Sequence, residues 1–190
     1  MKENNWFDPF YIQSHLSEEE SNIQKNVSNF CNNELKTNVV ERNRKNEFDK
    51  DLYPKFGSLG VLGQTVKTHG GSGTSNLAYG LVAYEFEKID SSYRSAISVQ
   101  SSLVIHPISE FGSEEQKDKY LPELIKGEKI GCFGLTESEA GSDPASMKTS
   151  FKKTKDGYIL NGSKNWITNA PIADIFICLL YTSDAADEWR

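Results

Sequence analysis

The chain has 190 residues, of which 37% are hydrophobic and 25% are charged, a composition typical of a soluble globular protein. Its net charge of -6 argues against a surface that binds nucleic acid without sequence preference, because such a surface needs a basic stripe. No apolar run approaches the roughly 20 residues needed to cross a bilayer. We therefore expect small molecules or other subunits as partners, with no nucleic acid and no membrane span.

The cysteines and histidines are too scattered to form a metal site or a disulfide framework. Cys31, Cys132 and Cys178 lie far apart and form no C-x-x-C pair. The three histidines likewise form no pair at i, i+4. This pattern predicts a protein of a reducing compartment that holds no metal.

The first helix is predicted to follow an irregular arm at residues 1–16. Ser17 opens the sequence SEEE, a capping box in which the Ser17 hydroxyl accepts a backbone amide and the Glu20 side chain reaches back. Apolar residues then recur at spacings of four as a narrow stripe, made of Ile23, Val27, Cys31 and Leu35. We expect this helix to lie on the surface of a helical domain.

A shorter helix and a glycine-rich loop are expected next. Phe48, Leu52 and Phe56 repeat the spacing of four before Gly57 interrupts it. The loop at residues 68–74, THGGSGT, has the composition of a phosphate-binding loop. It lacks the Lys-Ser/Thr pair of a P-loop, and no strand clearly precedes it, so a simple connection between helices is the preferred interpretation.

Two largely buried helices should follow this loop. Residues 76–90 carry a dense apolar set, with Glu85 and Lys88 among the charged residues on the remaining face. The apolar members are Leu77, Leu81, Val82, Phe86 and Ile89. Residues 91–108 are rich in small side chains, which allow a neighbour to approach closely, and Pro107 should bend or end this helix.

The pattern changes after Gly127 from helical to strand-like. Ser113 and Gln116 form a second capping box, which opens a last helix that stops near Gly127. Short β-favouring segments follow, separated by Asp-Gly and Asn-Gly turn signals, at residues 130–135, 150–153, 158–161, 164–168 and 174–178. The predicted fold class is α+β multidomain, with an all-α domain at residues 17–128 and the start of a β domain at residues 129–177.

Two motifs in the β unit carry the functional signal. GCFGLTESEAGSDP, at residues 131–144, places hydroxyls and exposed backbone amides beside apolar walls, which suits a planar, polar-edged ligand that carries phosphates. In NGSKNWITNA, at residues 161–170, Trp166 lies two residues before Thr168. In a strand this spacing turns both side chains to the same face, so we expect an aromatic plate and a hydroxyl to face one ligand.

LTESEAGSDP followed by NGSKNWITN resembles the acyl-CoA dehydrogenase family, whose members join a helical N-terminal domain, a middle β-barrel and a C-terminal four-helix bundle. The resemblance covers residues 8–176 and implies this fold in truncated form. Within the family, YRSAISVQSSLVIHPI and FGSEEQKDKYLPELIKGEKIGCFGLTE are similar to the glutaryl-CoA dehydrogenases. Residues 178–190, CLLYTSDAADEWR, resemble instead the translation of a sequencing-library adapter, and we expect this tail to be foreign to the protein.

The resemblance implies that FAD binds along the first motif. The flavin-side wall would consist of Phe133, Gly134, Leu135, Thr136 and Ser142. The Thr136 hydroxyl would bind the pyrimidine edge, and Ser142 would lie near the pyrophosphate and the bound acyl-CoA. A plain role in the barrel core is the alternative for Phe133 and Leu135.

The second motif would complete the flavin site. By resemblance, Trp166 would pack against the isoalloxazine and Ile167 would add a backbone contact. The Thr168 hydroxyl would approach N5, where negative charge grows on reduction, and would stabilise the reduced flavin electrostatically. A strand tryptophan is more often simply part of a core, and this interpretation of Trp166 stays open.

The resemblance to glutaryl-CoA dehydrogenases assigns the distal carboxylate of the substrate to Arg94 and Ser95, with Glu87 nearby and Ser142 beside the acyl-CoA. A guanidinium at the end of a dry tunnel would pair a carboxylate that is costly to bury alone. From the residues alone, Arg94 would be a surface ion-pair partner of Glu87 or Asp90, and such a pair would contribute little to stability. Only the surrounding YRSAISVQSS resemblance overturns that interpretation.

By resemblance the full-length protein would convert glutaryl-CoA to crotonyl-CoA and CO2, with an electron-transferring flavoprotein as acceptor. The catalytic Glu would lie in the C-terminal domain, so no catalytic residue is assigned here, and Glu137 and Glu139 are expected to be structural. A homotetramer in a bacterial cytoplasm or a mitochondrial matrix is implied, and the lack of a leader sequence favours the former. The alternatives are a short- or medium-chain acyl-CoA dehydrogenase and a non-catalytic helical fragment.

Overall fold

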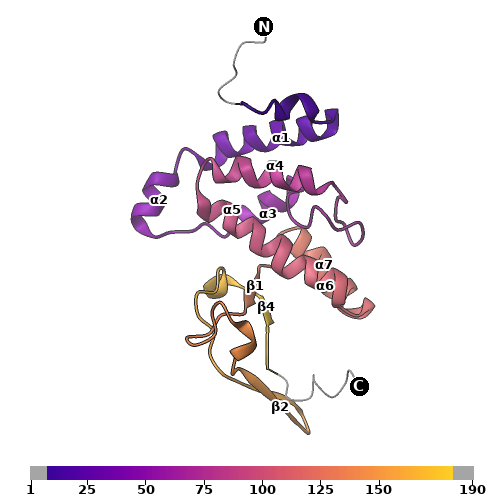
Figure 1. Cartoon of the computed structure of the whole chain (residues 1–190), viewed down its shortest axis with the longest axis vertical. Coiled ribbons are helices and arrows are strands. Elements are labelled where there is room, and N and C mark those ends of the chain that lie inside the picture. The colour runs from indigo at the N-terminus through magenta and orange to yellow at the C-terminus, as the bar shows by residue number, and fades with distance from the viewer. Residues whose placement is uncertain (1–7, 182–190) are drawn as a thin grey trace.

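Helices and strands occupy separate parts of the protein. The computed structural model describes residues 8–181, and Figure 1 shows the helices as one body with the strands gathered below it. This arrangement confirms the α+β class, with a helical unit followed by a β unit. Residues 1–7 of the expected arm and residues 182–190 of the expected tail lie outside the described residues.

The helical unit extends to residue 125. Its helices are α1 (Glu18–Phe30), α2 (Val39–Lys45), α3 (Leu52–Ser58), α4 (Asn76–Glu87), α5 (Ser91–Ser98), α6 (His106–Phe111) and α7 (Glu114–Ile125). A 3-10 turn, η1 (Ile12–His15), precedes them, and two π-helical turns, η2 (Cys31–Leu35) and η3 (Val99–Ile105), continue α1 and α5. Within the described residues, none of these helices is both long and apolar enough to cross a membrane.

Both predicted capping boxes are confirmed. At the start of α1 the Glu20 amide donates to the Ser17 hydroxyl at 3.2 Å, and the Ser17 amide donates to the Glu20 carboxylate at 3.0 Å. At the start of α7, Ser113 and Gln116 exchange the same two bonds, at 3.3 and 2.9 Å. These local bonds satisfy amides that a helix start leaves without partners.

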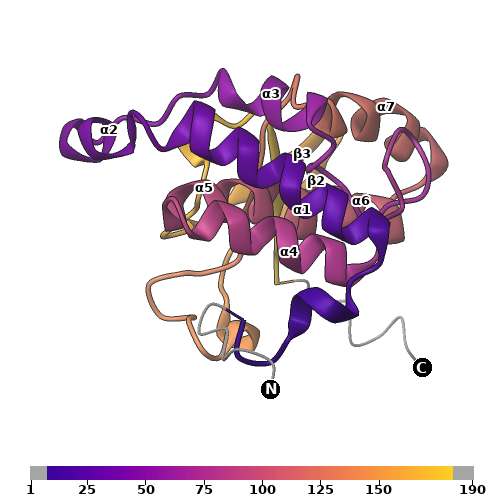
Figure 2. The same cartoon turned by 90° about the horizontal axis from the view of Figure 1, so that it is seen from above.

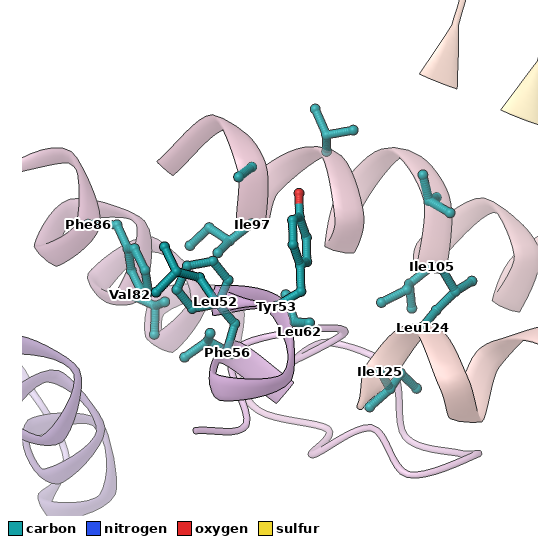
Figure 3. Packing of buried hydrophobic residues seen from close by; sticks show 14 of the residues in the cluster. Leu52, Tyr53, Phe56, Leu62, Val82, Phe86, Ile97, Ile105, Leu124 and Ile125 are labelled. Atoms are coloured by element: carbon teal, nitrogen blue, oxygen red, sulfur yellow. The ribbon is translucent and has the colours of Figure 1, made fainter. Parts of the chain in front are cut away.

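Helix α3 lies at the centre of the hydrophobic core. Tyr53 and Phe56 are fully buried, and the Phe56 ring meets the Phe86 ring of α4 edge to face, with centroids 5.3 Å apart. Figure 3 shows this aromatic cluster at one end of the core and Ile105, close to Leu124 of α7, at the other. The core is therefore shared by α3, α4 and the run from α5 to α7.

Helix α2 was not anticipated by the sequence pattern. Figure 2 shows α1 and α4 side by side and α2 projecting beyond them. None of the residues of α2 is buried, so it has no continuous apolar stripe from which it could have been predicted.

The predicted exposure of two residues in α4 is wrong. Leu77 was expected in the core but is exposed, whereas Glu85 was expected on the surface but is only 3% exposed. The Glu85 carboxylate accepts bonds from the Gln24 amide and the Lys88 ammonium, both at 2.9 Å. These partners offset the cost of burying the charge beside α1. Leu77 lies on the exposed side of the first turn of α4, whose next residue, Ala78, is buried.

Pro107 does not end its helix. It lies inside a continuous helical run, since Ile105 and His106 both have helical backbone angles, and the run continues to Phe111. The turn directly before it is the π-helical η3, as expected where a proline cannot donate a hydrogen bond to the preceding turn.

The β unit contains two separate strand pairs. Strands β1 (Gly131–Gly134) and β4 (Ile175–Cys178) are parallel, with Gly131 opposite Ile175. Strands β2 (Ser150–Thr154) and β3 (Gly157–Asn161) form an antiparallel hairpin, as the Asp156-Gly157 turn signal predicts. Two 3-10 turns complete the unit, η4 (Pro144–Ser146) and η5 (Ala170–Ile172).

The predicted strand at residues 164–168 is wrong. This segment is irregular. Trp166 within it has a left-handed backbone conformation with φ of 61°, and Asn169 directly after it has φ of 71°. Strand alternation therefore does not apply, and the prediction that Trp166 and Thr168 share one face of a strand is wrong.

Candidate functional site

The end of β1 and the segment at residues 162–165 are held together by backbone and side-chain bonds. The Asn165 amide donates to the Thr136 carbonyl at 2.9 Å, and the Lys164 ammonium donates to the Leu135 carbonyl at 2.9 Å. The two sequence motifs, far apart in the chain, therefore lie side by side. Gly134 and half-buried Phe133 belong to β1 itself.

A buried ion pair fixes this junction. Lys164 contacts the Glu137 carboxylate at 2.7 Å, and each side chain is only 9% exposed. Glu137 also accepts bonds from the Thr149 hydroxyl and from the Lys148 and Thr149 amides. The bond from Lys164, followed by those from Thr149 and Lys148, lowers the pKa of Glu137 to about 2. Glu137 thus anchors the loop, as expected of a structural rather than a catalytic carboxylate.

Polar and aromatic groups beside this junction are free for a ligand. Within residues 8–181 the hydroxyls of Thr136, Ser142 and Thr168 make no hydrogen bond, and the Trp166 side chain is 92% exposed. Gly141 has open space where a side chain would lie. Free hydroxyls and an exposed aromatic side chain, carried by two segments that are bonded to each other, are groups that a planar ligand with polar edges such as a flavin can use.

A cavity of about 490 Å³ lies where the β unit meets the helical unit. Thr168 and Asn169 line it from the β unit, and Ser95 lines it from α5. The remaining lining residues are Asn46, Phe48, Ser92, Ala96, Pro171 and Ile172. One residue predicted for the cofactor and one predicted for the substrate therefore share a single cavity.

Glu87 and Arg94 form an ion pair beside this cavity but do not line it. The Arg94 Nε donates to the Glu87 carboxylate at 2.7 Å, and both side chains are partly exposed. The Ser91 hydroxyl also donates to Glu87, and these two bonds, Ser91 first, lower the pKa of Glu87. Asp90 caps α5 by accepting from the Ser92 amide at 2.8 Å, so the chain turns between the paired residues.

The cavity wall differs from the one that the sequence motifs predict. Trp166 does not line the cavity that contains Thr168, and half-buried Ile167 separates the two in an irregular segment. Asn46 and Asn169 of the cavity wall were not predicted, although both have left-handed backbone conformations. Asparagine tolerates that conformation better than most residues, so an Asn at the end of a motif is a usable signal.

Models of two protein-family domains match consecutive parts of the chain. The acyl-CoA dehydrogenase N-terminal domain matches residues 17–128, and the acyl-CoA dehydrogenase middle domain matches residues 132–189. The second match extends across the segment expected to be foreign, whose origin stays a prediction.

Relatives that are named for different substrates are about equally similar to this chain. The chain is 40% identical over 174 residues to mitochondrial isovaleryl-CoA dehydrogenase of Pongo abelii, covering 90% of this chain and 41% of that protein. It is 39% identical over 172 residues to the short-chain specific acyl-CoA dehydrogenase of Megasphaera elsdenii, covering 88% of this chain and 45% of that protein.

A solved structure extends the comparison. Glutaryl-CoA dehydrogenase of Mycobacterium smegmatis in complex with FADH2 superimposes with a TM-score of 0.89 at 42% identity, covering 92% of this chain and 45% of that chain. The chain thus spans less than half the length of the relatives that it matches.

Proposed function

The chain belongs to the acyl-CoA dehydrogenase family, and from that premise we propose that it supplies part of the cofactor and substrate site of a FAD-dependent oxidoreductase. The reaction would be the oxidation of an acyl-CoA thioester at its α and β carbons. The cavity that joins Thr168 to Ser95 is the observation that carries this proposal. FAD, when bound, supplies the chemistry of hydride acceptance.

The residues around the junction would hold the cofactor by complementary contacts. Thr136 and Thr168 carry hydroxyls without partners in the described chain, which suits them to the pyrimidine edge and to the N5 side of an isoalloxazine. Ser142, near open Gly141, would serve the pyrophosphate and the acyl-CoA. Exposed Trp166 would cover the ring, with Ile167 beside it. Phe133, Gly134 and Leu135 would form the apolar wall.

We propose glutaryl-CoA as the substrate, with decarboxylation to crotonyl-CoA following the oxidation. The support is the position of Arg94 immediately before Ser95, which lines the cavity, and the guanidinium that remains partly exposed. Sequence identity does not decide the acyl chain, because the isovaleryl, short-chain and glutaryl relatives are 40%, 39% and 42% identical.

A straight-chain or branched neutral substrate is the second candidate. The Glu87 carboxylate already pairs with Arg94 at 2.7 Å, and a neutral acyl chain would leave that pair undisturbed. A dicarboxylic substrate would instead have to compete with Glu87 for the guanidinium or share it.

The general base, the electron acceptor and the other subunits are proposed to lie outside this chain. The general base, a Glu in the C-terminal domain of the family, is proposed to come from the portion of the relatives that the chain does not cover. We propose an electron-transferring flavoprotein as the electron acceptor and a homotetramer as the assembly. The compartment would be a bacterial cytoplasm or a mitochondrial matrix.

FAD binding can be tested on the 190-residue chain by flavin fluorescence titration. We expect saturable binding, and Thr168→Ala should raise the dissociation constant by about threefold to tenfold, the effect of losing one hydrogen bond. Thr65→Ala, at an exposed threonine of the helical unit, is the matched control and should have no effect. Absence of saturable binding would count against the proposed function of this chain.

The substrate is tested in a full-length protein that contains this chain. Arg94→Ala should lower kcat/KM for glutaryl-CoA by about a hundredfold, because a charge-assisted carboxylate contact is lost, and should change butyryl-CoA turnover little. Arg94→Lys keeps the charge but not the planar fork, so we expect partial rescue. Equal losses on both substrates would favour the neutral-substrate candidate.

A further inference from the structure

Asn169 adjoins Thr168 on the wall of the cavity and has an unusual set of contacts. Its backbone is left-handed, with φ of 71°, and its side-chain amide donates to the Gly131 carbonyl at 3.1 Å. Its own carbonyl accepts from the Ile172 amide at 2.9 Å. Asn169 thus links β1 to the turn that carries Thr168.

Gly131, which accepts the bond from Asn169, is itself fixed against the helical unit. Its amide donates to the Gln100 side chain of η3 at 2.8 Å, and a side chain added at Gly131 would lie 2.4 Å from Val104 Cγ1. Gln100 is fully buried, and its amide nitrogen donates to the Leu124 and Lys129 carbonyls at 3.0 and 2.8 Å. The first residue of β1 is therefore held against η3 by its amide and by its close approach to Val104.

A buried hydroxyl from the helical core completes the environment of Asn169. Figure 3 shows the Tyr53 hydroxyl pointing away from α3, and within the described residues it makes no hydrogen bond of standard geometry. Burial raises the pKa of Tyr53, and the only opposing influence comes from the Asn169 side chain. A buried hydroxyl without a partner is rare, and Asn169 is the polar neighbour positioned to supply one.

We propose that Asn169 is a positioning residue, whose side chain, held between the Gly131 carbonyl and the Tyr53 hydroxyl, fixes the turn that places Thr168 at the cavity wall. The role toward the flavin rests on the function proposed above. The fixing of the turn does not, because it is a property of the chain without cofactor. The bond to Gly131 joins β1 to the segment that carries Thr168, and the buried Tyr53 hydroxyl of α3 is the third group in the proposed arrangement.

The test begins with the flavin-free 190-residue chain, using amide hydrogen exchange measured by NMR. Asn169→Gly keeps the left-handed backbone but removes the side-chain amide. It should speed exchange of the Ala170 and Ile172 amides, which bond within the turn, by about tenfold. Tyr53→Phe should also speed exchange of these two amides, and combining it with Asn169→Gly should give no further increase.

Asn46→Gly is the matched control, because Asn46 is also left-handed and its side chain makes no hydrogen bond within residues 8–181. It should leave the exchange of Ala170 and Ile172 unchanged. Unchanged exchange in Asn169→Gly as well would overturn the proposal.

The second readout is the FAD dissociation constant. Asn169→Gly should raise the FAD dissociation constant by about tenfold. Adding Thr168→Ala should then raise it by less than about twofold, because the Thr168 hydroxyl is already misplaced and contributes little to binding. Faster exchange with unchanged FAD affinity would show that Asn169 is merely structural and would overturn its role toward Thr168. If the unaltered chain binds no FAD, the proposed function of the chain fails, while the exchange data still decide whether Asn169 fixes the turn.

Discussion

The helical unit and the β2–β3 hairpin differ in how completely they bury their apolar side chains. Tyr53, Phe56 and Phe86 of the helical unit are all 0% exposed, whereas Phe151 and Tyr158 of the hairpin are 43% and 67% exposed. Apolar burial is the main favourable contribution to folding. Stability is therefore concentrated in the helices, and the hairpin offers an apolar surface that suits contact with further protein.

The largest expected effect on stability comes from removing a buried aromatic ring from the helical core. Phe56→Ala should lower the free energy of unfolding by about 3–5 kcal/mol, because Phe56 contacts the rings of Phe30, Tyr53 and Phe86. Phe151→Ala, which removes a ring from the hairpin, should cost less than about 1 kcal/mol. Urea denaturation followed by circular dichroism measures both, and similar losses would contradict the contrast between the units.

The junction between the units should be next in sensitivity. Gln100→Leu leaves the Gly131 amide and the Leu124 and Lys129 carbonyls without their partner, which costs about 1–3 kcal/mol. Gln64→Leu is the matched control, since Gln64 is also buried but its side-chain oxygen accepts no bond within the described residues. Chemical denaturation should show the control to be nearly neutral, and an equal loss would contradict a special role for Gln100.

Acid should loosen the β unit before the helical core. The pKa of Glu137 falls from 4.5 to about 2 on folding, so its contribution is complete above pH 4.5 and is lost as the pH falls toward 2. NMR shifts of the Lys148 and Thr149 amides, which donate to Glu137, should follow this loss. Glu137→Gln should abolish the dependence, and its persistence in that variant would assign it to another group.

The smallest effect is expected at the surface pair of Glu87 and Arg94. Both side chains are partly exposed, so Arg94→Ala should change the free energy of unfolding by less than about 1 kcal/mol. Denaturation at low and high salt measures this directly. A larger loss would mean that Arg94 supports the fold. A fall in glutaryl-CoA turnover in Arg94→Ala could then result from destabilisation rather than from a lost substrate contact.

Features set by neighbours in the sequence were predictable. The caps at Ser17 and Ser113 depend on bonds across three residues, and the Asp156-Gly157 turn depends on the glycine conformation itself. Such local bonds form wherever the same residues recur. The family motifs likewise led to the cavity containing Thr168 and Ser95.

Features set by distant contacts were not predictable. Glu85 is buried because Gln24, on another helix, bonds to it, and no periodicity within α4 contains that information. Trp166 belongs to a segment whose β-favouring composition is overridden by left-handed residues and by the bonds of Lys164 and Asn165 to the first motif. Tertiary contacts decide the conformation at both places.

The pairing of β1 with β4 also sets an order of events during protein synthesis. The ribosome has synthesised α1 to α7 before it reaches residue 131, and domains generally fold as units in the order of synthesis. Gly131 can therefore bind Gln100 on an already formed surface. Its strand partner, Ile175, appears more than forty residues later. Parallel pairing is then the late step, and the helical unit acts as the template on which the sheet begins.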